Sequence, residues 1–209
     1  MGMKKPNWRL NLGRKGGFWQ NGYWYDLHLE RRMPLAIPML EELLIALPPL
    51  VEDTVVCDLA CGTGNGSFTV LSAYPSANVV LIDRDAEMLQ IAQAKLNELQ
   101  VDPVLIEATI STDGDPLPSG PYDVVVATLS LHELVGENLS VAEAENRYEL
   151  LFQSIHESLV PGGHIIIGDH VGALSLYRQL KAMERAGFQD VDCAWRQDDF
   201  FVAGGQAPV

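Results

Sequence analysis

The stretch VVCDLACGTGNGS (residues 55–67) decides how this chain folds, because an apolar run with strand character leads directly into a loop rich in glycine. Gly62, Gly64 and Gly66 fall within five residues. Glycine costs conformational entropy, so a chain concentrates it where the backbone needs positive φ or a close approach by a ligand or another segment. Asp58 places a carboxylate in front of this loop. The stretch therefore predicts a ligand site at a strand-to-helix turn.

Strands and helices alternate along the rest of the chain. The expected strands are residues 54–60, 77–83, 102–108, 122–131 and 163–169, followed by a hairpin of 188–196 and 199–205. The expected helices are residues 26–50, divided at Pro34 and Pro38, and 65–75, 84–100, 140–159 and 173–186. This order predicts a doubly wound α/β fold: a mostly parallel, seven-stranded sheet with an antiparallel C-terminal hairpin. In such sheets ligands bind beyond the carboxyl ends of the strands, where the glycine-rich loop lies.

Length and charge narrow the class of protein. The chain has 209 residues, and we expect a single domain over residues 26–209. The formal net charge is −14, and so acidic a surface repels phosphate backbones, which argues against a nucleic-acid partner. No apolar run is long enough to span a membrane and no secretory leader is legible, so we expect a cytoplasmic protein. The oligomeric state stays open, with a homodimer as one option.

The glycine-rich loop departs from the dinucleotide-binding pattern. That pattern is G-x-G-x-x-G, whereas residues 62–67 read GTGNGS and end on Ser67. A carboxylate at Asp58 would repel a pyrophosphate at a cost on the order of a kcal/mol. The same carboxylate attracts the sulfonium and ammonium of S-adenosyl-L-methionine, and Asp83, after the next strand, can accept hydrogen bonds from ribose hydroxyls. We therefore predict S-adenosyl-L-methionine as the cofactor; a nicotinamide-dependent or aminopropyltransferase-like enzyme is an alternative.

Five motifs over roughly residues 26–204 resemble those of class I S-adenosylmethionine-dependent methyltransferases. DLACGTGNG matches the glycine motif [DE]-x-[GA]-x-G-x-G, and LIDRDAEML resembles the second motif, whose acidic residue holds the ribose. YDVVVATLSLHEL, LVPGGHIIIGD and AGFQDVDCAW resemble the fourth-strand motif, the approach to strand five and the segment before the last hairpin. All five occur in order and at the family's spacing. The resemblance implies a Rossmann-like fold and the activity of a methyltransferase.

The resemblance also implies which positions contact the cofactor. Those at its methionine end are Asp58, Ala60, Gly62 and Gly64; Asp83 would hold the ribose, Arg84 and Met88 would flank the adenine, and Ala127 and Leu129 would lie along the cofactor. Thr109 stands where many relatives have an aspartate that accepts from the adenine amino group. A hydroxyl can still accept that bond, although more weakly.

Two histidines are candidate catalytic residues, because methyl transfer needs a base only when the acceptor must lose a proton. His132 follows the fourth strand and His170 the fifth, so both lie at the reactive edge. Glu133 and Asp169 could orient a base or bind a cationic acceptor. The sequence HEL is not His-Glu-x-x-His, so no metal is predicted. We expect a small-molecule acceptor; the alternatives are a non-catalytic S-adenosylmethionine or S-adenosylhomocysteine sensor and an RNA-modifying methyltransferase.

Residues 1–25 differ from the rest of the chain. They contain five Lys and Arg residues, no acidic residue and many aromatic residues among glycines, so we expect an irregular basic and aromatic arm. Relatives commonly insert helices after strand five to roof the substrate, but only residues 170–173 stand there in this chain. The leading candidate for that cover is the N-terminal segment that holds Phe18, Trp19, Tyr23, Trp24 and Tyr25. A partner subunit's helix and an inert tail are the alternatives.

Overall fold

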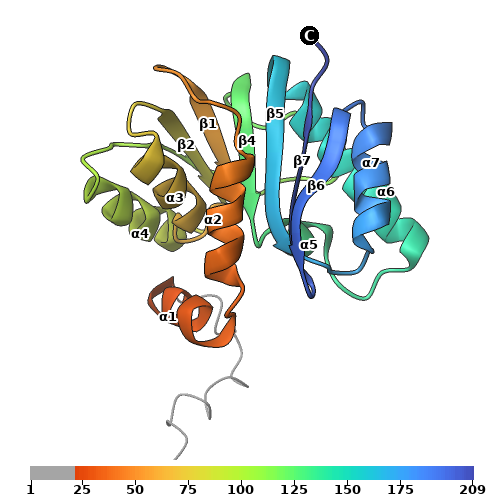
Figure 1. Cartoon of the computed structure of the whole chain (residues 1–209), viewed down its shortest axis with the longest axis horizontal. Helices are drawn as coiled ribbons and strands as arrows, with labels where there is room; N and C mark the ends of the chain where they lie inside the picture. Colours follow the sequence, from red (N-terminus) through yellow and green to blue (C-terminus); the bar gives the residue numbers. More distant parts are fainter. Residues whose placement is uncertain (1–21) are drawn as a thin grey trace, which may run out of the picture.

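The apolar runs expected as strands all pair into one sheet in the computed structural model, which describes residues 22–209 (Figure 1). The strands are β1 (Val55–Leu59), β2 (Asn78–Asp83), β3 (Val104–Glu107), β4 (Tyr122–Thr128), β5 (Leu159–His170), β6 (Gln189–Gln197) and β7 (Phe200–Gln206). Their order is β3-β2-β1-β4-β5-β7-β6. The strand β7 runs antiparallel to both of its neighbours, β5 and β6, and the other described pairs are parallel, which confirms the predicted fold class and hairpin. The order reverses between β1 and β4, the position at which such sheets bind ligands.

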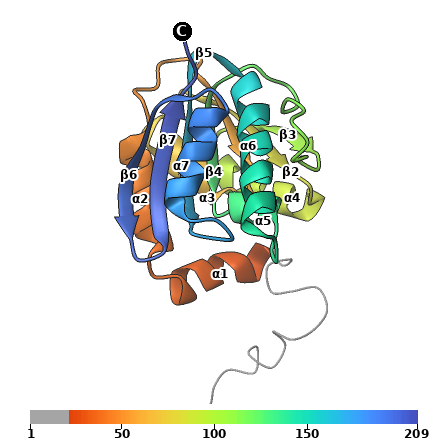
Figure 2. The same ribbon diagram turned by 90° about the vertical axis from the view of Figure 1, so that its right-hand side faces the viewer.

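Helices cover both faces of this sheet (Figure 2). They are α1 (Gly22–Arg32), α2 (Ala36–Ala46), α3 (Asn65–Ala73), α4 (Ala86–Asn97), α5 (Leu131–Val135), α6 (Val141–Glu157) and α7 (Leu176–Arg185). The helices α2, α3 and α4 share one apolar cluster with one face of the strands, including Leu43, Leu71 and Leu96. The helices α5, α6 and α7 share a second cluster with the opposite face, including Leu131, Phe152 and Met183. The alternation of strands and helices therefore produces the two-sided burial expected of a doubly wound sheet.

Local signals explain where several helices begin. Asp85 caps α4, because its side chain accepts hydrogen bonds from the backbone N–H groups of Glu87 and Met88. Ser140 and Glu143 form a reciprocal capping box at the start of α6. None of the described helices is long and apolar enough to cross a membrane.

The structure differs from the sequence-based expectation at four places. Pro38 does not interrupt the second helix but lies in its first turn, where a missing N–H group breaks no helical bond. The segment expected as one strand over 122–131 ends at Thr128 and continues into α5. The strand expected at 163–169 begins earlier, at Leu159, so residues 160–162 also belong to β5. The first helix begins at Gly22, so residues 22–25 of the expected irregular arm are helical.

The first helix lies beyond the edge at which the parallel strands end, opposite the C-terminus (Figure 1). It contacts α2 and α4. This position places α1 over the glycine-rich loop and over the predicted ligand site. The remainder of the predicted arm, including Phe18 and Trp19, lies outside the described residues.

Candidate functional site

The glycine-rich loop turns from β1 into α3 through a series of positive φ angles, at Ala60 (52°), Gly62 (52°) and Gly64 (77°). A Cβ built on Gly64 would lie 2.8 Å from the Cβ of Ala92, so this glycine permits the packing of α4. A Cβ on Gly66 would meet Thr128 at 3.0 Å. A Cβ on Gly62 would meet nothing within 4 Å. The loop therefore packs closely at two glycines and leaves open space for a ligand at the third.

Asp58 is fully buried beside this loop and uses one side-chain oxygen for the protein. Its Oδ2 accepts hydrogen bonds from the backbone N of Ser67 (2.9 Å) and from Ser67 Oγ (2.6 Å). Its Oδ1 is buried without a hydrogen-bond partner among the described residues. Burial raises the pKa of Asp58 to about 6, although the hydrogen bonds from Ser67 act to lower it. An unpartnered buried carboxylate oxygen fits the cationic end of S-adenosylmethionine.

Asp83, at the end of β2, ties the loop to the next turn. Its Oδ2 accepts from the backbone N of Gly62 at 2.8 Å, and its Oδ1 accepts from the backbone N of Asp85 at 2.9 Å. A carboxylate has roughly four lone-pair sites, so each oxygen can accept a further bond from a ribose hydroxyl. Asp83 thus has a structural role that the sequence did not predict, in addition to its expected role in binding.

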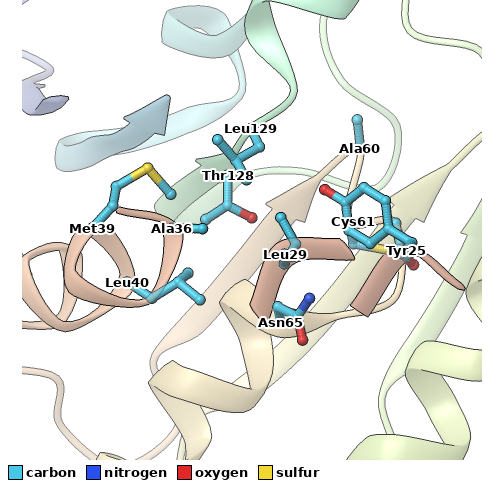
Figure 3. A pocket seen from close by; sticks show the side chains of 11 residues that line it. Tyr25, Leu29, Ala36, Met39, Leu40, Ala60, Cys61, Asn65, Thr128 and Leu129 are labelled. Atoms are coloured by element: carbon cyan, nitrogen blue, oxygen red, sulfur yellow. Dashed lines mark hydrogen bonds between the residues drawn. The ribbon is translucent and has the colours of Figure 1, made fainter. Parts of the chain in front are cut away.

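A small pocket of about 40 Å³ lies between α1, α2, the glycine-rich loop and the end of β4 (Figure 3). The predicted cofactor residues Ala60, Gly62 and Leu129 line it, together with Cys61, Asn65 and Thr128. Tyr25 and Leu29 line it from α1. The first helix therefore forms one wall of the pocket.

Four further predicted cofactor residues do not line this pocket and differ in exposure: Met88, Arg84, Thr109 and Ala127. Met88 is buried, and a Cβ built on Gly22 of α1 would lie 3.2 Å from its Sδ. Arg84 and Thr109 are exposed at the ends of β2 and β3. Ala127 is fully buried in the core cluster behind β4. The N-terminal end of α1 thus occupies the neighbourhood in which Met88 was expected to flank the adenine.

His132 and Asp169 form a hydrogen-bonded pair near the same edge. His132 Nδ1 lies 2.6 Å from Asp169 Oδ1, and the backbone N of His132 donates to Asp169 Oδ2 at 3.2 Å. The backbone N of His170 also donates to Asp169 Oδ1, at 2.8 Å. Asp169 is almost completely buried, so three donors hold its carboxylate in place. This arrangement fixes the orientation of the His132 ring and leaves Nε2 for chemistry.

The two predicted histidines therefore have different surroundings. Burial acts to lower the pKa of His132, but the hydrogen bond and charge of Asp169, with the charges of Glu133 and Glu137, outweigh it and raise that pKa above its usual value. His170 stacks on His132 with ring centroids 3.9 Å apart. Atoms of His132, Asp169 and His170 that could bind a metal lie within 4.8 Å of one another. His132 and Asp169 are already hydrogen-bonded to each other, the arrangement of a base and the carboxylate that orients it.

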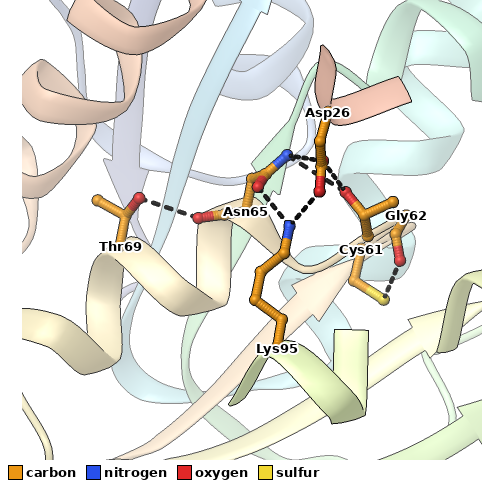
Figure 4. A network of polar contacts seen from close by, with 7 residues as sticks. Asp26, Cys61, Gly62, Asn65, Thr69 and Lys95 are labelled. Atoms are coloured by element: carbon orange, nitrogen blue, oxygen red, sulfur yellow. Dashed lines mark hydrogen bonds and ion pairs between the residues drawn. The ribbon is translucent and has the colours of Figure 1, made fainter. Parts of the chain in front are cut away.

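A polar network that the sequence did not predict fastens α1 to the loop (Figure 4). Asp26 accepts from Thr63 Oγ1 at 2.6 Å and from Asn65 Nδ2 at 2.9 Å, and it pairs with Lys95 Nζ at 2.8 Å. Lys95 Nζ also donates to Asn65 Oδ1 at 2.6 Å. We call these four residues, Asp26, Thr63, Asn65 and Lys95, the α1 clasp. Its members lie up to 69 residues apart in sequence, and no local pattern links them.

Comparisons with known proteins agree with this geometry. Residues 50–200 match the family model described as a methyltransferase domain. A trans-aconitate 2-methyltransferase of Paracidovorax citrulli is 31% identical over 124 residues, which cover 59% of this chain and 42% of that protein. A ribosomal RNA large subunit methyltransferase G of Colwellia psychrerythraea is 30% identical over 127 residues, which cover 59% of this chain and 30% of that protein. The chain thus spans less than half the length of these two relatives.

Solved structures share the fold at low sequence identity. The S-adenosylmethionine-dependent methyltransferase SibL in its apo form has a TM-score of 0.69 at 16% identity, over 100% of this chain and 64% of that one. Human N-acetylserotonin methyltransferase in complex with S-adenosylmethionine has a TM-score of 0.62 at 14% identity, over 98% of this chain and 61% of that one.

The strand order and the likeness to solved structures define a Rossmann-like fold. The family match covers residues 50–200, so the chain belongs to the methyltransferase domain family. S-adenosylmethionine is the cofactor of such enzymes, and the buried Oδ1 of Asp58 and the open space at Gly62 fit it.

Proposed function

We propose that this domain transfers a methyl group to a hydroxyl of a small-molecule acceptor, with His132 as the general base. The observation that carries the proposal is the 2.6 Å contact of His132 Nδ1 with the buried Asp169, close to the edge that holds Asp58 and the glycine-rich loop. A base is required for a hydroxyl acceptor, which must lose its proton during the reaction. The histidine–carboxylate pair therefore favours an oxygen acceptor.

Some residues of the site would bind the cofactor, and others would remove the proton of the acceptor. When bound, S-adenosylmethionine supplies a methyl group on a cationic sulfur that keeps the electron pair of the broken bond. Asp58 would hold the cationic end of the cofactor, and Asp83 would hold its ribose. Asp169 accepts from Nδ1–H, which fixes the tautomer of His132 with a lone pair on Nε2. His132 Nε2 takes the hydroxyl proton, and the charge of Asp169 stabilises the resulting imidazolium.

A small-molecule acceptor is favoured over RNA by charge. The relatives include proteins named for trans-aconitate, for ribosomal RNA and for tRNA, so names alone do not decide. The net charge of −14 opposes the approach of a phosphate backbone. The histidine–carboxylate pair also counts against a cofactor sensor, which would need no base.

Release of S-adenosylhomocysteine tests the proposal. The wild-type protein is incubated with S-adenosylmethionine and either a panel of small hydroxy compounds or total RNA, and His132→Gln is assayed in parallel. We expect turnover with a hydroxy compound and a loss of about a hundredfold or more in the variant, since general base catalysis contributes roughly 10²–10⁴-fold. Calorimetry should give both proteins the same cofactor affinity. Full activity in the variant would exclude His132 as the base, and turnover with RNA alone would exclude the small-molecule acceptor.

A further inference from the structure

The side of His132 that faces away from Asp169 carries another carboxylate. Glu133 Oε1 lies 3.9 Å from His132 Nε2, the nitrogen that takes the proton in the proposed reaction. That distance is too long for a hydrogen bond, so the carboxylate keeps its capacity to accept. The side chain of Glu133 is 64% exposed, against 2% for Asp169. Asp169 is therefore occupied in orienting the base, whereas Glu133 is accessible to an incoming acceptor.

Other groups near the base are also acidic. Glu133, Glu137 and Asp169 all act on the titration of His132. The phenol of Tyr25, in the pocket wall, experiences the charges of Asp169, Asp26, Glu133 and Asp58. Of two cations on neighbouring elements, Lys95 is paired with Asp26 in the α1 clasp, whereas Arg147 keeps its charge and donates to the backbone O of Val135 at 2.9 Å. The carboxylates of Asp169, Glu133 and Glu137 thus create a negative potential around His132.

A polar group at this corner also lacks a hydrogen-bond partner among the described residues. The Tyr148 hydroxyl is buried without a hydrogen-bond partner in the described part of the chain. It lies 3.9 Å from where a Cβ on Gly172 would be, and that point is 2.8 Å from the Cβ of His132. Buried hydroxyls are almost always satisfied, so a polar ligand group or a water completes this one.

Aromatic rings extend from the same corner. The His132 and His170 centroids are 3.9 Å apart at 42°, and the His170 and Phe200 centroids are 6.0 Å apart. All three side chains are only partly buried. Aromatic faces attract flat rings. A row of rings beside a free carboxylate is thus suited to a flat acceptor whose positive charge lies at the carboxylate.

We propose that Glu133 is a specificity-determining residue that selects an acceptor with a positively charged group near the reacting hydroxyl. The inference rests on the proposed function. An acceptor that bonds His132 Nε2 through its hydroxyl and Glu133 through an ammonium would separate these groups by roughly 3–9 Å, given hydrogen bonds of about 2.8 Å. A carboxylate in place of the ammonium would face Glu133 directly, so a polycarboxylate such as the trans-aconitate in the relatives' names fits this corner poorly.

Three phenols test the inference, because their ortho substituents differ in charge. They are 2-(aminomethyl)phenol, which is positive, 2-(hydroxymethyl)phenol, which is neutral, and 2-hydroxybenzoate, which is negative. Binding of each is measured by calorimetry at saturating S-adenosylhomocysteine, and turnover is measured with S-adenosylmethionine. We expect the amine to bind about tenfold more tightly than the neutral phenol and the carboxylate to bind most weakly. Glu133→Gln should raise KM for the amine about fivefold to tenfold and leave KM for the neutral phenol within about twofold. Glu157→Gln, an exposed carboxylate at the far end of α6, is the matched control and should change nothing.

The outcomes separate this inference from the proposed function. Equal or tighter binding of the carboxylate, or an identical KM change for amine and neutral phenol in Glu133→Gln, would overturn charge selection. If none of the three phenols bound while S-adenosylhomocysteine still did, the inferred acceptor class would be wrong, and methyl transfer to another hydroxyl would still stand. Loss of methyl transfer to every hydroxy compound would instead remove the proposed function.

Discussion

Asp58 combines ligand binding with a cost to the fold. Burial raises its pKa to about 6, against the lowering effect of the hydrogen bonds from Ser67. Because the folded pKa lies above that of an unfolded aspartate, the stability contribution of Asp58 is present at low pH and is lost as the pH rises through about 6. A cation beside the unpartnered Oδ1 would offset this loss. The charge of Asp58 therefore lowers the stability of the empty protein and strengthens the binding of a cationic ligand.

Asp58→Asn should accordingly weaken cofactor binding and stabilise the empty domain. We expect the affinity for S-adenosylmethionine to fall about tenfold to a hundredfold, since a hydrogen bond to a charged group contributes roughly 1.5–3 kcal/mol. The melting temperature of the empty protein at pH 7.5 should rise by a few degrees, at about 2–4 °C per kcal/mol for a domain of this size. Calorimetry and thermal denaturation check both effects. A lower melting temperature with unchanged affinity would contradict the role given to Oδ1.

The same residue predicts a pH dependence of binding. Protonation of Asp58 below about pH 6 removes the negative charge from the site. The affinity of the wild-type protein for S-adenosylmethionine should therefore decrease as the pH falls from 7.5 to 5, and Asp58→Asn should lack this decrease. Titrations of both proteins at several pH values provide the measurement, and parallel curves for the two proteins would refute the assignment.

The role proposed for His132 predicts how the turnover rate depends on pH. The general base must be neutral, and Asp169 is the main group that raises the pKa of His132 against the effect of burial. Turnover should thus increase with pH through a pKa above 6.5. In Asp169→Asn this limb should move to lower pH and the plateau should fall about a hundredfold or more, because the amide no longer stabilises the imidazolium. The pH–rate profile of each protein tests this; an unshifted limb in the variant would show that another group titrates.

At the scale of single residues, the sequence predicted the positions of those site residues that lie at a fixed distance along the chain from a strand end. Asp58, Gly62 and Asp83 occupy fixed offsets from two strand ends, so their convergence follows from the parallel sheet. His132 and Asp169 could be placed at one edge for the same reason. What separates His132 from His170 is the ring orientation set by α5, which was not predicted because its segment has the apolar character of a continuing strand.

At the scale of elements, the strands and most helices were predictable because apolar periodicity and the caps at Asp85 and Ser140 are local signals. The position of α1 was not, since it depends on the contact of Asp26 with Lys95, 69 residues away. The α1 clasp holds a helix that walls the pocket through Tyr25 and Leu29. Gly22 also lies close to Met88 and Ile91, where a side chain on α1 would not fit. We therefore expect α1 to shift when a ligand as large as S-adenosylmethionine binds.

Loosening the α1 clasp should accelerate exchange of the cofactor. Asp26→Ala removes the acceptor for three donors, and we expect both the association and the dissociation rate of S-adenosylhomocysteine to rise, the latter by about tenfold. Lys95→Met leaves the bond from Thr63 to Asp26 in place and should have a smaller effect. Stopped-flow displacement measures both rates. Rates equal to those of the wild-type protein in both variants would show that α1 does not control access.

At the scale of the whole molecule, charge is distributed unevenly. Five of the 14 Lys and Arg residues lie in residues 1–21, and all 28 acidic residues lie beyond them. Several of the remaining cations are paired with acidic neighbours: Arg178 with Glu145, Lys181 with Glu184 and Arg185 with Glu149. These pairs leave α7 with little free positive charge. The arm that precedes α1 thus carries the main basic cluster in the sequence.

This distribution predicts weak interaction with nucleic acid. A protein binds RNA largely by replacing phosphate counterions with Lys and Arg, so affinity requires a basic surface and falls steeply with salt. We expect no methyl incorporation into total RNA above background at about 150 mM salt, and weak binding at low salt that disappears when Lys4, Lys5, Arg9, Arg14 and Lys15 are changed to Gln. The variant with all five substitutions should keep the wild-type rate with small hydroxy acceptors, which do not need the basic cluster. Incorporation of labelled methyl groups into RNA and release of S-adenosylhomocysteine measure the two activities side by side. Robust RNA methylation at physiological salt that vanishes in the variant would reverse the assignment and make the arm an RNA-binding element.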